Sequence, residues 1–304
     1  MSDIDPKELS DLLALPYSVE TQTKIARLLN VGGDAESQFA CEEHFEGAMM
    51  LLSLISSKIV GKRTTLGRSF GSAVLGKICL TAVSAQALFR AHEAGELPTL
   101  DHSSIAVLSR TIIESSIMYW YLTEEVSEEE WAFRLQVMKI HDSSARVRFW
   151  KSLMPEQADE ERAILSQLRD ELKEMPAFRK RAEPDKTKMR GGQTVYVNGM
   201  RSVVKSMGID ETYFDGVYNY LSAQVHATPI SYFRDSNDPA TSIVWSRAFS
   251  AYSLHHARLM MIRVAYREIQ LSGLEGEFDA GVINECREIA ARKILAPSGS
   301  KPTI

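Results

Sequence analysis

Cysteine is scarce in this chain of 304 residues, which has three: Cys41, Cys79 and Cys286. They lie far apart, and no two have the C-x-x-C spacing. This excludes a disulfide scaffold and a zinc site built on cysteine. So few thiols are typical of a reducing compartment, in which each thiol is a small core residue. We therefore expect a cytoplasmic protein.

Long uncharged apolar runs and an excess of positive charge are also missing. The first residues, Met1-Ser2-Asp3-Ile4-Asp5-Pro6, are acidic and polar, unlike a signal peptide. Charged residues interrupt the apolar runs before they reach membrane-spanning length, so we expect no transmembrane helix and no membrane partner. The net charge of −5 and a pI of about 5.9 argue against a surface built to wrap nucleic acid, although a local basic cleft stays compatible.

The alternation of apolar and polar residues that marks strands is nearly absent, whereas helical periodicity runs through most of the chain. We expect an all-α fold, a single bundle of about ten helices with no significant sheet. The bundle should occupy residues 34–296 and be followed by a disordered tail, residues 297–304. Residues 1–33 predict an N-terminal helical extension that packs on the bundle or on a partner, as in a homodimer.

The main helices should cover residues 34–60, 69–94, 105–123, 127–154, 159–174, 200–207, 211–227, 240–272 and 280–294. Residues 175–197 contain prolines, glycines and a basic cluster, so we expect them to be the least regular part. Asn198-Gly199 is a turn signal, and residues 194–199 are compatible with a short hairpin.

Two short motifs are weak indicators of ligands. Gly71 to Lys77 matches G-x-x-x-x-G-K of the phosphate-binding loop, but Ile78 stands where Ser or Thr should hold magnesium. Close packing of a Gly/Ala-rich helix explains it better. His255 and His256 are adjacent and lack a third metal ligand one turn away, so we expect neither a metal nor a cofactor.

Arg110 and Glu114 interrupt a helix that is otherwise apolar on nearly every side. They are four residues apart and therefore share one face. A buried charge needs a partner, so two charges in a central helix are either a clamp that fixes helix register or part of a site. Both interpretations stay open.

Tyr218, Ser222 and His226 form a second polar stripe at the same spacing, close before Pro229. Histidine titrates near neutral pH and serves as a general acid or base. A serine hydrolase is not indicated, because the G-x-S-x-G elbow is missing. We expect this stripe to face Arg110 and Glu114 in the core.

Arg134 and His141 are seven residues apart, close to two helical turns, and so share a face. A solvated helix side is the simpler explanation. They are nevertheless candidate substrate-binding residues, and Arg134 could also support Arg110 and Glu114.

Together these motifs resemble a group of uncharacterised, all-helical bacterial and phage proteins. The residues concerned are Arg110-x-x-x-Glu114, Tyr119-Trp-Tyr-Leu122, Arg134, and Tyr218-x-Tyr-Leu-Ser222-x-x-x-His226 followed by proline. The resemblance covers about residues 40 to 270. The chain is more distantly similar to the HEPN superfamily, whose members are helical bundles, often dimers, and in many cases metal-independent ribonucleases of toxin and anti-phage systems.

The HEPN motif places Arg and a polar residue side by side, then three residues, then His. Ser222 and His226 match it, but Leu221 stands in place of the Arg. The resemblance implies RNA as the partner, with His226 as the acid or base and Arg110 supplying the missing guanidinium. Glu114 would orient Arg110, while Tyr218 and Ser222 hold the ring or the phosphate. The alternative is a non-enzymatic binding or scaffold protein in which these residues form a buried structural network.

Overall fold

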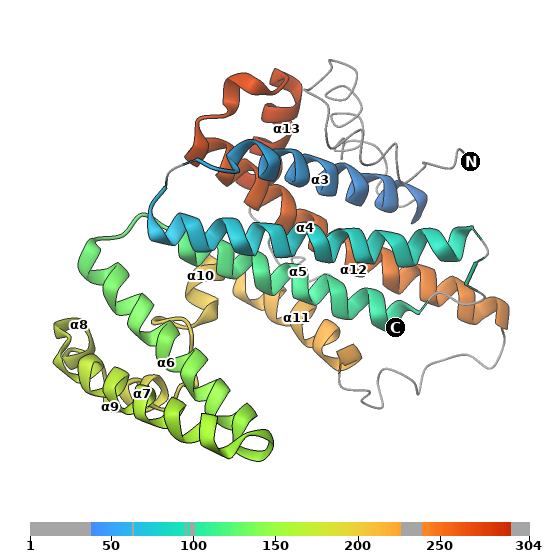
Figure 1. The fold of residues 1–304 in the computed structure, drawn as a ribbon. Helices are drawn as coiled ribbons and strands as arrows, with labels where there is room; N and C mark the ends of the chain where they lie inside the picture. Colours follow the sequence, from blue (N-terminus) through green and yellow to red (C-terminus); the bar gives the residue numbers. More distant parts are fainter. Residues whose placement is uncertain (1–37, 63, 95, 98–100, 226–238, 293–304) are drawn as a thin grey trace. The chain divides into compact units, whose positions relative to one another are not determined.

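The chain folds into helices throughout the part that the computed structural model describes, residues 38–62, 64–94, 96–97, 101–225 and 239–292 (Figure 1). Within these ranges there are 11 α-helices and no strands, which confirms the all-α prediction. The helices are α3 (Gln38–Ile59), α4 (Leu66–Glu93), α5 (His102–Thr123), α6 (Glu128–Leu153), α7 (Pro155–Glu174), α8 (Pro176–Arg179), α9 (Glu183–Arg190), α10 (Met200–Ser206), α11 (Glu211–Val225), α12 (Pro239–Ser272) and α13 (Ala280–Ala291), with a 3-10 turn, η2 (Glu275–Glu277).

Side-chain caps begin several of these helices. The Asp101 carboxylate accepts hydrogen bonds from the backbone N–H groups of Ser103 and Ser104 at the start of α5. The Ser127 hydroxyl accepts one from the Glu130 N–H at 3.2 Å and so caps α6. Thr65 caps α4 in the same way. Each cap satisfies one of the N–H groups that a helix start leaves unpaired.

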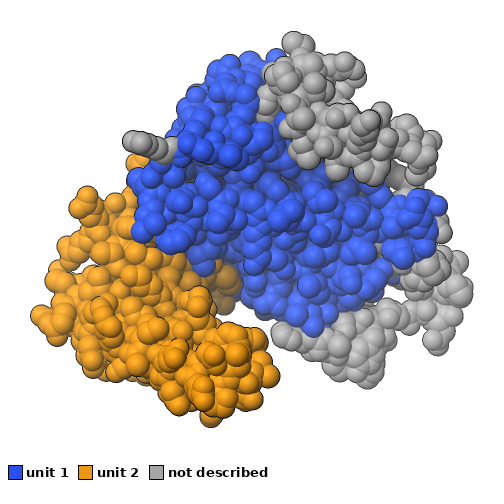
Figure 2. Space-filling model, in the orientation of Figure 1, with its two compact units in different colours: residues 1–122, 204–304 blue, residues 123–203 orange. Residues whose placement is uncertain are grey.

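The contacts divide the chain into two compact units, shown in Figure 2. Unit 1 comprises residues 1–122 and 204–304, and unit 2 comprises residues 123–203. Both units lie within the range 34–296 that the sequence suggests as one bundle, apart from the ends of unit 1. The predicted N-terminal extension, residues 1–33, and the predicted tail, residues 297–304, lie outside the described residues.

The core of unit 1 forms where α12 packs along α3 and against α13, while α3 also packs against α4. Apolar side chains at helical spacing meet there and are fully or almost fully removed from water. They include Phe45, Leu52, Ile55, Leu75, Ile78, Ile112, Met261, Val264, Ile269 and Val282. Burial of this size is the main force that holds the helices together.

Unit 2 is built on the pairing of α6 with α7, and α8 and α9 pack against α6. Its buried apolar side chains are fewer, among them Phe133, Val137, Ile140, Leu165 and Leu172. Polar contacts therefore contribute more to its specificity. The amide of Gln136, for example, donates to the backbone oxygen of Leu168 at 2.8 Å and to the Glu171 carboxylate at 3.0 Å.

One local prediction about unit 2 is wrong. Residues 175–197 are irregular as expected, apart from two short helices, α8 and α9, which have Pro176 and Pro184 in their first turns. Proline, which lacks an N–H group, is tolerated in the first turn of a helix because the N–H groups of that turn have no partner within the helix in any case. The hairpin at residues 194–199 is absent. Gly199, with φ of 79°, instead forms a turn that leads into α10.

Helix α4 differs from the expectation that no segment could span a membrane. By length and composition alone, its part Leu66–His92 is apolar enough to do so. In its most apolar window, 33% of the residues are buried within the structure. One such helix among the described residues is weak support for a membrane, since core helices have the same length and composition.

Candidate functional site

Helices α5 and α11 of unit 1 run alongside each other in opposite directions. At one end, the Ser103 hydroxyl near the start of α5 donates to the Gln224 side chain near the end of α11, at 3.1 Å. Further along, Arg110 meets Tyr218. The predicted contact between the Arg110–Glu114 helix and the Tyr218 helix is therefore present. The two helices meet there at the surface of the unit, however, and not in the core, where the contact was expected.

Three side chains close a ring of hydrogen bonds at this contact, which we call the Arg110 triad: Arg110, Glu114 and Tyr218. Arg110 Nε donates to Glu114 Oε1 at 3.0 Å, and Arg110 Nη2 donates to the Tyr218 hydroxyl oxygen at 2.8 Å. The Tyr218 hydroxyl in turn donates to Glu114 Oε1 at 2.7 Å. The guanidinium carbon also lies 4.8 Å from the centre of the Tyr218 ring, a cation–π distance.

The Arg110 triad lies at the surface of unit 1 and is partly exposed. The exposed fraction is 19% for the Arg110 side chain and 41% for that of Glu114. Burial lowers the pKa of Arg110, but the hydrogen bond with Tyr218 and the charge of Glu114 outweigh this and raise it. Burial and the bond to Glu114 raise the pKa of Tyr218. Arg110 therefore stays a fixed positive charge and Tyr218 a neutral donor.

Ser222 and His226 do not join the Arg110 triad within the described residues. The Ser222 hydroxyl donates to the backbone oxygen of Tyr218 at 2.6 Å, one turn earlier in α11. This is the usual position of a helical serine that satisfies itself. His226 follows Val225, the last residue of α11, and lies outside the described residues. Its approach to Arg110 therefore stays a prediction.

Arg134 and His141 belong to unit 2, and each has a partner there. Arg134 is almost buried and pairs with Glu124 at 2.8 Å and with Glu130 at 3.0 Å. His141 Nδ1 lies 3.0 Å from the backbone oxygen of Gly192. These contacts join helix α6 to its own unit, so a structural role accounts for both residues. The simpler interpretation of the sequence, a solvated helix side, is therefore wrong for these two residues.

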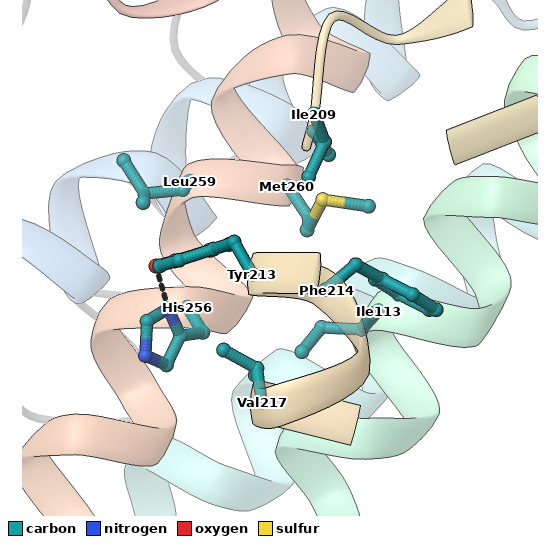
Figure 3. A pocket seen from close by; sticks show the side chains of 8 residues that line it. All are labelled: Ile113, Ile209, Tyr213, Phe214, Val217, His256, Leu259 and Met260. Atoms are coloured by element: carbon teal, nitrogen blue, oxygen red, sulfur yellow. Dashed lines mark hydrogen bonds between the residues drawn. The ribbon is translucent and has the colours of Figure 1, made fainter. Parts of the chain in front are cut away.

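A histidine and a tyrosine that the sequence did not bring together lie beside the Arg110 triad. The Tyr213 hydroxyl of α11 is 2.8 Å from His256 Nδ1 of α12, at the edge of an apolar pocket (Figure 3). The pocket volume is about 20 Å³, enough for one water molecule. Phe214 belongs to its wall and stacks on the Tyr218 ring with centroids 5.4 Å apart, which links the pocket to the triad.

Burial keeps this histidine neutral. The pKa of His256 falls to about 3, first because it is buried and then because His255 is adjacent. Burial is also the main cause that lowers the pKa of His255 to about 4, followed by the charges of Arg258 and His44. The sequence pointed to these histidines only as incomplete metal ligands. Nothing in it pairs His256 with Tyr213, since they are 43 residues apart on different helices.

No group of three or more metal-ligating side chains occurs within the described residues. Gly71 to Lys77 lie inside α4, so the backbone there is helical and cannot form a loop around a phosphate. The close-packing explanation of this motif fits the buried Gly71 but not Gly76, where an added Cβ would meet no atom within 4 Å. Two of the three cysteines fit the expected role of core residues, since Cys286 is buried and Cys79 is partly buried. Burial raises the pKa of the Cys79 thiol to about 11 and that of the Cys286 thiol to about 12.

No curated protein and no solved structure matches the chain in sequence comparison. A family model does match, over residues 70–240, more than half of the chain. The matched range runs from α4 to the start of α12 and contains the Arg110 triad, Arg134 and the Ser222/His226 motif. The family is described only as one of unknown function, and no relation to the HEPN superfamily is part of that description. On this match, the chain belongs to DUF5677, a family of unknown function.

Proposed function

We propose that this protein is a cytoplasmic, metal-independent endoribonuclease of the HEPN kind, which acts in bacterial defence or as a toxin. One observation carries the proposal: the partly exposed Arg110 guanidinium is held in a fixed position beside α11. The sequence that follows this contact on α11 has Ser222 and His226 in the spacing of the nuclease motif. Arg110 would thereby supply the positive charge that Leu221 cannot.

The Arg110 triad is suited to an anionic transition state. In RNA cleavage the ribose 2′-oxygen attacks phosphorus, the bond to the 5′-oxygen breaks, and negative charge builds up on the phosphoryl oxygens. A guanidinium stabilises this charge best when it needs no reorientation. Glu114 and Tyr218 hold Arg110 in place with hydrogen bonds of 3.0 and 2.8 Å. His226 would take the 2′-hydroxyl proton or give one to the departing 5′-oxygen.

A specific observation also favours the second candidate, a non-enzymatic binding or scaffold protein. Two of the three guanidinium nitrogens of Arg110 already bond to Glu114 and Tyr218, and the Ser222 hydroxyl bonds to its own helix. In that case the Arg110 triad is a clamp between α5 and α11. Such a ring of hydrogen bonds fixes the register of two helices without any chemistry.

RNA cleavage by the purified full chain, with and without a chelator, separates the two candidates. We expect cleavage that survives chelation and falls roughly 100-fold or more in His226→Ala and in Arg110→Gln. Arg146→Gln is the matched control, because Arg146 is exposed on α6 and pairs only with the exposed Asp142 among the described residues. Its cleavage rate should equal that of the unmodified protein.

Circular dichroism of each variant shows whether the fold survives. Unchanged cleavage in a folded His226→Ala variant contradicts the assignment of His226. Absence of cleavage by the unmodified protein over a panel of structured and unstructured RNAs favours the scaffold candidate.

A further inference from the structure

A second and larger cavity lies in unit 1, where the end of α3, the start of α4 and the end of α12 come together. Its volume is about 230 Å³. Polar side chains dominate its wall, in contrast to the apolar pocket beside Tyr213. They are Lys62, Thr64, Arg68, Ser72, Glu268 and Ser272. None of them belongs to the Arg110 triad, and only Ser72 belongs to a motif discussed above, the segment from Gly71 to Lys77.

A buried carboxylate organises this wall. Glu268 is almost fully buried, with a relative exposure of 3%. Its Oε1 accepts hydrogen bonds from Arg68 Nη2 at 3.0 Å and from the Ser272 hydroxyl, and its Oε2 accepts one from the Tyr119 hydroxyl. Arg68 Nη2 also donates to the Ser272 oxygen at 2.7 Å. Three donors satisfy the carboxylate, so Glu268 fixes Arg68 in place and has little capacity left for a cation.

The groups that stay available in the cavity favour a negatively charged ligand. Arg68 Nε is buried and has no hydrogen-bond partner among the described residues. This nitrogen is closed off from water, but Arg68 forms its hydrogen bonds only through Nη2 among the described residues, so Nη1 keeps its donors for a ligand. Lys62 lines the cavity and forms no ion pair in the part of the chain that the structure describes, although its charge acts on the nearby Glu277, which pairs with Lys58.

The charge balance points in the same direction. Lys62 and Arg68 bring two positive charges to the wall, and Glu268 brings one negative charge. The 28-residue helix α4 also begins here at Leu66, and its first turn adds the partial positive charge of a helix N-terminus. The wall thus has a net positive charge, with the Thr64 hydroxyl as a further donor.

We propose that this cavity binds the phosphate group of a small, free phosphorylated molecule. Lys62 would supply the mobile charge and Arg68, held by Glu268, the oriented donor. The volume exceeds many times the roughly 15 Å³ that one water molecule needs but lies below the usual range for drug-sized ligands. It therefore fits a phosphate with a short substituent. The site is independent of the proposed ribonuclease activity.

Thermal unfolding and isothermal titration of the full chain test this site, with inorganic phosphate, glycerol 3-phosphate and acetate as the three ligands. We expect saturable binding of one phosphate compound per chain, with glycerol 3-phosphate stronger than inorganic phosphate and acetate weakest. Lys62→Gln should weaken binding by roughly tenfold, the effect of losing one charge-assisted hydrogen bond. Lys62→Glu should abolish it.

Lys77→Gln is the matched control, because Lys77 is an exposed lysine of α4 that does not line the cavity. It should bind phosphate like the unmodified protein. Equal binding by the unmodified protein and Lys62→Glu overturns the proposal, as does a response that does not saturate. Stronger binding of acetate than of either phosphate compound overturns the assignment of phosphate. All three lysine variants change exposed side chains, so they should stay folded.

Discussion

The Tyr218 hydroxyl lies 2.8 Å from Arg110 Nη2, although the two residues are 108 positions apart in the chain. The same hydroxyl donates to Glu114, so one oxygen atom joins both members of the polar pair on α5 to α11. Both hydrogen bonds of the Arg110 triad between α5 and α11 therefore depend on the Tyr218 hydroxyl, whereas the Arg110–Glu114 bond lies within α5. Replacing Tyr218 with phenylalanine removes two hydrogen bonds and leaves the aromatic ring in place.

Tyr218→Phe should lower the free energy of unfolding by about 1–2 kcal/mol, since both lost hydrogen bonds involve a charged partner but lie near solvent. Urea unfolding followed by circular dichroism measures this change. Tyr252→Phe on α12 is the control, because Tyr252 is 43% exposed and no hydrogen bond of its hydroxyl occurs within the described residues. Unchanged stability in Tyr218→Phe would mean that the hydrogen bonds of its hydroxyl add none.

Gly192→Ala should destabilise unit 2 by about 2–4 kcal/mol. The backbone φ of Gly192 is +63°, and an added Cβ would lie 2.3 Å from the Ser144 hydroxyl oxygen. Gly199→Ala separates the two causes, because its φ is +79° but nothing lies within 4 Å of the added Cβ. It should lose only about 1 kcal/mol, from backbone strain alone. Equal melting temperatures of the two variants would exclude the steric clash.

Arg134→Met should destabilise the protein by about 1–3 kcal/mol, whereas Arg146→Met should change its stability by less than about 0.5 kcal/mol. Both arginines lie on α6 and pair with a carboxylate one turn away, but their side chains are 6% and 58% exposed. Water weakens the exposed pair. Chemical unfolding of both variants measures the difference. If Arg134→Met retains full stability but loses affinity for RNA, Arg134 is a binding residue rather than a structural one.

Stability should fall as the pH drops below 6.5, because His255 and His256 are buried in the neutral form. Their folded pKa values, about 4 and about 3, lie below the ordinary value of 6.5. In the window between 6.5 and about 4, the unfolded chain therefore binds more protons than the folded one, and each group lowers stability by up to about 1.4 kcal/mol per pH unit. Urea unfolding at three pH values, roughly 7.5, 6 and 5, measures the slope across this window.

The variant His256→Gln should have a shallower pH dependence in this window, whatever its stability near neutral pH. His92→Gln, at the end of α4 and distant in sequence from the pair, is the control and should keep the slope of the unmodified protein. An unchanged slope in His256→Gln would show that His256 is not the group that titrates.

Much of the helical content follows from the sequence because its causes are local. Asp101 and Ser127 are close to the N–H groups that they cap, and apolar side chains three and four residues apart fall on one helix face. The prolines at positions 176 and 184 show the limit of such rules. Proline can end one helix or begin the next, and only the surrounding chain decided that α8 and α9 begin there.

Part of the candidate site was also predictable. Arg110 and Glu114 share a helix face by spacing, and the polar stripe with Tyr218 supplies their partner, but their position at the surface rather than in the core was not predicted. The pairing of Tyr213 with His256 and of Glu268 with Tyr119 and Arg68 was not predictable. Glu268 is 149 positions from Tyr119 and 200 positions from Arg68, so no local pattern connects them.

The sequence by itself determined the all-α class, most helix boundaries and which polar residues share a helix face, such as Arg110 with Glu114. The tertiary structure decided which helices meet, which histidines are buried and neutral, and where a polar cavity opens between α3, α4 and α12. The physical reason is the distance along the chain over which each kind of interaction acts. Helix formation depends on hydrogen bonds and side chains within one or two turns, whereas burial and partner choice depend on packing between segments that the chain order does not bring together.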